Sequence, residues 1–221
     1  MGSGAAQVDF YYSTQSIYCY CLIDRMIWLR DQGVEVQIRP VLGGVIREPE
    51  RYKDRCPIQT AYFKADAART AARLGLPVHG PDPSPIDFKS GPGWQAQDEQ
   101  PRNAWLNQLF VSAVVSGGGF AFLDHVMRGL WAGTVKQWDQ PGALAPLLAS
   151  AGFDHDTLIA AMSPQAARDI LDANAAAMIA AGHWGVPLMV YRDEPFYGQD
   201  RFDHLTWRMA QHGDLSEGAP S

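Results

Sequence analysis

The sequence predicts an α/β fold in which a small sheet is built from both ends of the chain and a large all-helical insertion lies between them. Strand patterns lie near the two ends, and the middle of the 221 residues carries helical patterns. The first two strands are joined by a single helical run, and such a crossover places the strands parallel and is right-handed in nearly all proteins. These three observations define the fold class.

The first part of the chain carries a strand, a helix and a second strand. Residues 8–12 form an apolar and aromatic run typical of a short strand, and residues 17–29 form a long apolar run typical of a helix. Gly33 is a typical helix stop. Residues 34–39 alternate between apolar and polar, which predicts a strand with one buried face.

The middle of the chain predicts helices and one long loop. Residues 57–74 are rich in alanine and are followed by a glycine, which predicts a helix. Residues 80–101 are rich in proline and glycine without periodicity, and a loop of that length is usually a lid or a mobile segment. Further helices are predicted from residue 103, at 120–131, at 141–151, after a cap at Asp154 or Asp156, and from the Ser163-Pro164 cap to residue 182.

The end of the chain returns to strands and closes with a helix. Strands are predicted at residues 186–191 and 195–197, and an amphipathic helix follows residue 200. This order of elements matches a thioredoxin-like fold with a large all-helical insertion. It divides the chain into a first half of the thioredoxin-like domain at residues 1–45, a helical insertion domain at 46–182 and a second half at 183–221. The architecture alone is compatible with many functions.

The composition excludes several classes of partner. Lys and Arg number 18 against 24 Asp and Glu, for a net charge of −6, and no basic run suits nucleic acid. No segment approaches the roughly 20 apolar residues that cross a bilayer, so we expect no membrane partner. The three cysteines do not form a disulfide framework pattern. Residues 1–7 lack the basic and apolar regions of a secretory signal, so we expect reduced thiols and a cytoplasmic location.

Ser16 lies where the first predicted strand turns into the first predicted helix. Such a turn has unpaired backbone N–H groups and a partial positive charge, which lower the pKa of a nearby thiol. A serine there is either a helix cap or a hydroxyl that hydrogen-bonds a thiolate, and the local sequence alone favours the cap. No G-x-S-x-G context surrounds Ser16, so a serine hydrolase is not expected. The six histidines include no close pair at metal-ligand spacing, so no metal is expected.

Six short segments carry a resemblance to a known family. They are VDFYY at 8–12, SIY at 16–18, RPVL at 39–42, GLWA at 129–132, GVP at 185–187 and YGQDR at 197–201. In this order and spacing they resemble 2-hydroxychromene-2-carboxylate isomerase and its relatives, the kappa-class glutathione transferases. The resemblance implies a DsbA-like thioredoxin architecture, glutathione as the cofactor and a homodimer.

The resemblance also implies roles for particular residues. Ser16 matches the serine that hydrogen-bonds the glutathione sulfur, which makes it the expected catalytic residue. The bond between Val186 and Pro187 is expected to be cis and to present the Val186 backbone to glutathione. Gln199 and Asp200 match the pair that holds the γ-glutamyl end, although an aspartate at a helix start can equally be a cap.

Several positions depart from the family pattern. Redox-active relatives carry Cys-x-x-Cys where this chain has Ser16 and Cys19. Because dithiol exchange needs two sulfurs, we do not expect a disulfide oxidoreductase, and Cys19 is expected to be a small core residue. Ile17 stands where the family usually has proline. Arg51 and Gln59 stand near an asparagine and a lysine of the family that contact glutathione or substrate, so other groups must bind the peptide carboxylates. We assign Arg51 to cofactor binding, with Arg47 and Lys53 as alternatives.

Four residues are candidates for the substrate pocket: Ser13, Tyr62, His183 and Trp184. Ser13 stands where the family often has an acidic residue, and His183 and Trp184 lie beside the expected cis bond. Core packing is the alternative role for Trp184. Tyr62, Phe63, Trp94 and Trp105 are expected to be core residues first and pocket walls second.

These expectations point to a glutathione-dependent isomerase of a small aromatic or conjugated organic acid in aromatic catabolism. Its reaction would be reversible thiolate addition, bond rotation and elimination. One alternative is a kappa-type glutathione transferase that releases the conjugate. A second alternative is a redox-inactive thioredoxin-fold protein that binds a peptide or another protein.

Overall fold

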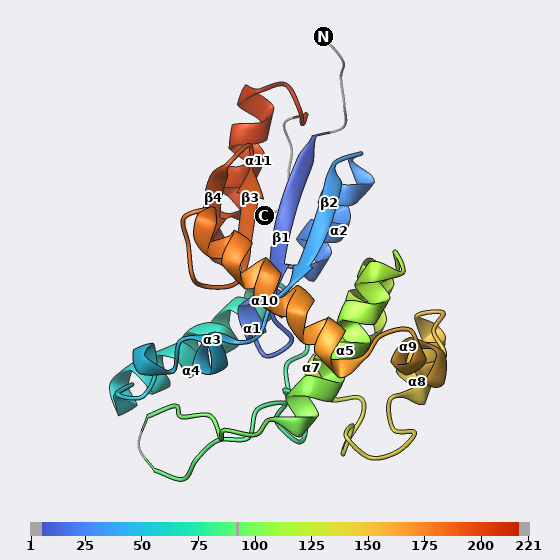
Figure 1. The fold of residues 1–221 in the computed structure, drawn as a ribbon. Coiled ribbons are helices and arrows are strands. Elements are labelled where there is room, and N and C mark those ends of the chain that lie inside the picture. The colour runs from blue at the N-terminus through green and yellow to red at the C-terminus, as the bar shows by residue number, and fades with distance from the viewer. Residues whose placement is uncertain (1–5, 92, 217–221) are drawn as a thin grey trace.

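The computed structural model describes residues 6–91 and 93–216, and its elements follow the expected order (Figure 1). The strands are β1 (Gln7–Tyr12), β2 (Glu35–Pro40), β3 (Leu188–Tyr191) and β4 (Glu194–Tyr197). The helices are α1 (Ile17–Tyr20), α2 (Ile23–Asp31), α3 (Gly44–Arg47), α4 (Pro57–Arg73), α5 (Pro101–Val115), α6 (Gly119–Ala121), α7 (Arg128–Trp131), α8 (Ala145–Ser150), α9 (His155–Ala160), α10 (Pro164–Ala180) and α11 (Phe202–Gln211). The expectation that residues 1–7 hold no secretory signal falls mostly outside the described residues.

One mixed sheet brings the two ends of the chain together (Figure 1). Its strand order is β2-β1-β3-β4, with β1 parallel to β2 and antiparallel to β3, and β3 antiparallel to β4. In the register, Phe10 of β1 is paired with Ile38 of β2 and with Met189 of β3. The predicted parallel pair and the α/β class with helices between the two halves are confirmed.

The helix expected at residues 17–29 is two helices, which corrects the prediction. α1 ends at Tyr20 and α2 begins at Ile23. At the break the Leu22 N–H donates to Cys19 O at 3.1 Å, which spans three residues as in a 3₁₀ turn rather than four as in an α-helix. Cys21 and Leu22, the two residues at the break, are both buried. α1 is therefore a single turn.

Within the insertion the expected helices are present with shifted boundaries. Asp154 rather than Asp156 caps α9, because its carboxylate accepts from the Thr157 N–H at 2.9 Å. Ser163 caps α10 in the same way, accepting from the Ala166 N–H at 3.1 Å. The helix expected at residues 141–151 begins only with α8, and the helix expected at 120–131 contains a π-helical turn, Phe122–Met127.

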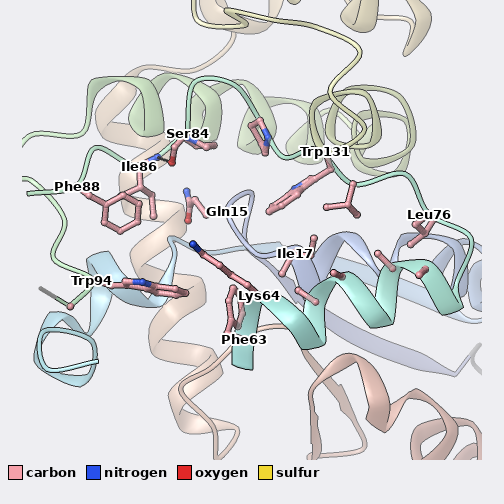
Figure 2. A pocket seen from close by; sticks show the side chains of 18 of the residues that line it. Gln15, Ile17, Phe63, Lys64, Leu76, Ser84, Ile86, Phe88, Trp94 and Trp131 are labelled. Atoms are coloured by element: carbon pink, nitrogen blue, oxygen red, sulfur yellow. Dashed lines mark hydrogen bonds between the residues drawn. The ribbon is translucent and has the colours of Figure 1, made fainter. Parts of the chain in front are cut away.

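The described parts of the long loop, residues 80–91 and 93–100, are attached to the rest of the insertion. The indole of Trp138 is fully buried, stacks on Trp105, and donates to Pro83 O at 2.6 Å. Phe88 and Ala96 form an isolated antiparallel bridge within the loop. These attachments place the loop across from α4, with Ser84, Ile86 and Phe88 facing that helix (Figure 2).

Aromatic rings join the sheet to the insertion in one core. Tyr12 of β1 packs edge-on against Phe110 of α5, with ring centres 5.5 Å apart, and Phe110 stacks on Phe122 at 5.3 Å. All three rings are fully buried. Because the C-terminal end of β1 is held in this way, the turn that carries Ser16 starts from a rigid base.

Two features are absent from the described part of the chain. None of its helices has the length and apolar character needed to span a bilayer. Nor do residues 6–91 and 93–216 hold a group of three or more metal-ligating side chains.

Candidate active site

Ser16 lies at the start of α1 and in the wall of a pocket. Its backbone is extended (φ −95°, ψ 113°), and its hydroxyl accepts from the Cys19 N–H at 3.3 Å, so Ser16 is an N-cap. The same half-buried side chain lines a pocket of about 300 Å³. The cap uses a lone pair of the oxygen, so the hydroxyl proton remains as a donor. α1 is one turn long, so it has almost no helix dipole. The positive partial charge at its start comes from the N–H groups of Ile17 and Tyr18.

Cys19 and Cys21 are buried thiols rather than nucleophiles. Burial raises the pKa of Cys19 to about 12, against the opposing effect of the Ser13 N–H, which donates to the sulfur at 3.5 Å. Burial likewise raises the pKa of Cys21 to about 11. Cys56 is exposed. The expectation that Cys19 is a small core residue is confirmed.

We expect iodoacetamide at pH 8 to label Cys56 in the native protein and to spare Cys19 and Cys21. The thiolate is the reacting form, and raised pKa values of about 12 and 11 keep the two buried thiols protonated. In the unfolded chain a thiol titrates at about 8.5. Below that pH the two buried, neutral thiols make their full contribution to the free energy of unfolding. This contribution declines as the pH rises towards 11 and 12. Mass spectrometry of native and urea-unfolded protein counts the labels, and native labelling of Cys19 would contradict the assignment.

The cis-proline segment forms part of the wall of the pocket at Ser16. The peptide bond between Val186 and Pro187 is cis, as expected. Val186 lines the pocket, and Pro187 O accepts from the Gly198 N–H at 2.9 Å. Ser13 lines the same pocket, and its hydroxyl donates to Gln15 Oε1 at 2.8 Å. The structure therefore brings the segment that contains Ser16 and the segment that precedes Pro187 together in one pocket.

Gln199 and Asp200 lie beside this site and not in the wall of the pocket. Gln199 accepts two hydrogen bonds from the buried Arg25, at 2.6 Å on its side-chain oxygen and at 2.9 Å on its backbone oxygen. Asp200 is exposed and pairs with Arg201 at 3.3 Å. It does not cap α11, so the capping role left open for it is excluded. Burial raises the pKa of Tyr197, a pocket residue, and Asp200 adds to that shift.

Two arginines, Arg47 and Arg55, line the pocket. Arg47 donates through Nε to Leu42 O at 2.7 Å and through Nη2 to Trp184 O at 2.9 Å. Burial lowers the pKa of Arg47. The Arg55 guanidinium lies over the Trp94 ring, 4.0 Å from its centre. Among the described residues, Nη1 of Arg47 and Nε of Arg55 are buried without a hydrogen-bond partner. Such nitrogens suit an anionic ligand.

Five residues considered for the site lie outside the walls of both pockets: Arg51, Lys53, Tyr62, His183 and Trp184. Arg51 lies over the Trp184 ring at 4.4 Å and pairs with Glu48 at 3.4 Å. His183 stacks on the pocket residue Tyr197 with ring centres 3.9 Å apart, and burial lowers its pKa. Tyr62 is 65% exposed, so the expectation that it is a core residue is wrong.

A second and larger pocket adjoins the first (Figure 2). Its volume is about 800 Å³, and it lies between α4 and the loop that follows that helix. The two pockets share Gln15, Phe63, Ile86, Phe88 and Trp94. Phe63 and Trp94 are therefore pocket walls, which was their second expected role. The wall is mainly apolar, and this suits an organic ligand.

Sequence reasoning missed Gln15, Tyr52, Arg55 and Lys64, which all line a pocket. Gln15 reaches both pockets because Gly43 has no side chain, and a Cβ there would overlap Gln15 Oε1. The one usable signal for Arg55 was the spacing of the basic residues between 47 and 55. That spacing does not say which of them face a ligand.

Comparison with protein families agrees with this fold. The family described as DSBA-like thioredoxin domain matches residues 7–210, nearly the whole chain. The predicted thioredoxin-like fold with a helical insertion is therefore confirmed. No curated protein matches the chain.

Several solved structures are similar over most of their length. A 2-hydroxychromene-2-carboxylate isomerase has 22% identity and a TM-score of 0.64, over 96% of this chain and 100% of its own. A probable DsbA oxidoreductase of Streptomyces coelicolor has 20% identity and a TM-score of 0.63, over 98% of this chain and 92% of its own. The cytosolic disulfide reductase DsbM of Pseudomonas aeruginosa has 16% identity and a TM-score of 0.59, over 93% of this chain and 99% of its own. DsbM has also been solved with GSH. At these identities the likeness establishes the fold and leaves the reaction open.

Proposed function

The chain belongs to the DSBA-like thioredoxin domain family, and from that premise we propose that it is a glutathione-dependent isomerase of a small aromatic or conjugated organic acid. The observation that carries the proposal is the meeting of three features in one pocket: the Ser16 hydroxyl, the cis-proline segment and the unpartnered nitrogens of Arg47 and Arg55. Disulfide exchange is not proposed, because a hydroxyl stands where it needs a sulfur.

The residues of the pocket fit glutathione. The tripeptide carries two carboxylates, and Arg47 and Arg55 offer buried nitrogens that still need an acceptor. The Val186 backbone would hold the peptide part, and Gln199 and Asp200 would hold the γ-glutamyl end from beside the pocket. When bound, glutathione would supply a thiolate nucleophile that adds reversibly to a conjugated double bond, about which rotation then becomes possible.

The chain itself would stabilise charge and exclude water. The Ser16 hydroxyl and the N–H groups of Ile17 and Tyr18 would donate to the sulfur and favour its charged form. The adjoining apolar pocket would hold the organic acid beside the sulfur, with the loop at residues 80–101 shielding it from solvent. We place this activity in the cytoplasm, where thiols stay reduced.

We expect purified protein to isomerise 2-hydroxychromene-2-carboxylate only when glutathione is present, with a rate that saturates as glutathione rises. Glutathione should not be consumed, because the thiolate that adds also leaves. Absorbance spectroscopy follows the isomerisation, and a thiol assay follows the glutathione. Undiminished turnover without glutathione would contradict the proposal.

The same experiment separates the alternatives. A stable thioether, detected by mass spectrometry together with loss of free thiol, would identify a glutathione transferase. Failure to bind glutathione in calorimetry would favour a non-catalytic protein that binds peptides at the cis-proline segment.

A further inference from the structure

The larger pocket is too large for a single-ring acid. Its volume is about 800 Å³, compared with about 300 Å³ for the pocket at Ser16. Pockets of this size hold ligands of drug-like size. The five residues shared by the two pockets make the larger one continuous with the site of the proposed reaction. An occupant can thus extend well away from Ser16.

The larger pocket has one cationic end and one apolar end. Along α4 the lining residues are Lys64 and then Ala67, Ala68, Ala71 and Ala72. Eight residues of helix separate the first from the last, which is about 12 Å along the axis. Leu76, Val78 and Trp131 also line the pocket, and Figure 2 shows Leu76 towards the other end of α4 from Lys64. Figure 2 shows the Lys64 amine pointing towards Gln15, at the end that adjoins the pocket of Ser16.

Lys64 is free to pair with a ligand. The pocket has two lysines in its wall, and Lys89 is already paired with Asp98 at 2.7 Å. The Lys64 amine has no ion pair or hydrogen bond with any other residue within 6–91 and 93–216. Lys64 is an exposed position and its amine faces Gln15, so a ligand carboxylate would form a partly solvated ion pair with it.

We propose that the larger pocket binds an elongated apolar organic acid, with its carboxylate at Lys64 and a body of two or more rings lying along the alanines of α4 towards Trp131. This orientation puts the atoms next to the carboxylate beside the pocket of Ser16, where a conjugated double bond would have to lie. Naming this acid as the substrate rests on the proposed function, but its binding does not require glutathione.

The test is calorimetry without glutathione, using biphenyl-4-carboxylate as the probe. Benzoate lacks the second ring and should bind at least about tenfold more weakly, because burying a ring is worth more than that factor. Biphenyl-4-carboxamide keeps the shape without the charge and should bind about fivefold more weakly, as for the loss of a partly solvated ion pair.

Variants of α4 locate the two ends. Lys64→Met should lower the affinity for biphenyl-4-carboxylate about fivefold, to that of the carboxamide, and Lys64→Arg should restore it. Lys89→Met is the matched control and should leave both affinities unchanged, since Lys89 already has a partner. Ala72→Phe should weaken biphenyl-4-carboxylate at least about fivefold and spare benzoate, by filling the far end. Lys64 and Ala72 are exposed positions of α4, so the variants should fold, which circular dichroism verifies.

Three results would overturn the inference: no binding of biphenyl-4-carboxylate at millimolar concentration, equal affinity for the acid and the amide, or an effect of Lys64→Met on glutathione alone. These outcomes are separate from failure of the proposed function. If the probes and variants behave as expected while glutathione never supports turnover, the acid site stands and the isomerase proposal fails. If glutathione-dependent turnover is found but ring number and Lys64 do not matter, only the acid site fails.

Discussion

Replacing Ser16 by alanine should lower glutathione-dependent turnover at least about 100-fold, because removing one donor to a developing or bound anion typically costs that much in an active site. The same change removes the cap on α1, in which the hydroxyl accepts from the Cys19 N–H at 3.3 Å. Loss of a cap costs about 1 kcal/mol of unfolding free energy. The effect on kcat at saturating glutathione should therefore far exceed the effect on stability in urea.

Ser163→Ala is the matched control for this prediction. Ser163 caps α10 by accepting from the Ala166 N–H at 3.1 Å, and it lines neither pocket. It should lose a similar amount of stability, about 1 kcal/mol, and keep full turnover. If Ser16→Ala behaves like Ser163→Ala in both measurements, Ser16 is only a cap and has no catalytic role.

Replacing Arg55 by methionine should raise the Kd for glutathione at least about tenfold, because a charge-assisted hydrogen bond to a carboxylate is lost. The monoethyl ester of glutathione, which lacks the glycyl carboxylate, probes the same contact from the ligand side. Wild-type protein should bind the ester about as weakly as Arg55→Met binds glutathione if Arg55 meets that carboxylate. Arg55→Met should then bind the ester and glutathione with the same Kd, because removing the second partner of a contact that is already lost has no further effect.

Arg51→Met provides the comparison for Arg55. Arg51 was assigned to the cofactor from the sequence, and in the structure its guanidinium lies over Trp184 at 4.4 Å, outside both pockets. We expect its loss to change the Kd by less than about twofold, as for an exposed charge. Loss of affinity in Arg51→Met with none in Arg55→Met would restore the assignment made from the sequence and remove the role given to Arg55.

The order of elements was readable in the chain because it depends on local patterns, and the candidate site serine was readable because short segments resemble a known family. Alternation and helical spacing predicted the strands and most helices, and the two apolar runs on either side of Ser16 placed it at a strand-to-helix turn. The resemblance of short segments to a known family implied the cis bond at Pro187, and the serine in place of the first cysteine of the relatives' Cys-x-x-Cys implied that Cys19 is a core residue. Periodicity says which face of an element is buried.

Other features arose only when distant segments met. Arg25 holds Gln199 from 174 residues away, and Arg47 reaches Trp184 O across 137 residues. Whether Arg51 or Arg55 faces a ligand, and whether Lys64 has a partner, depends on which loop packs over α4. Periodicity cannot specify what covers a buried face, because that is set by the free energy of packing between elements that are far apart in sequence. The site serine could therefore be named from the chain, while its arginines and the large apolar pocket needed the fold.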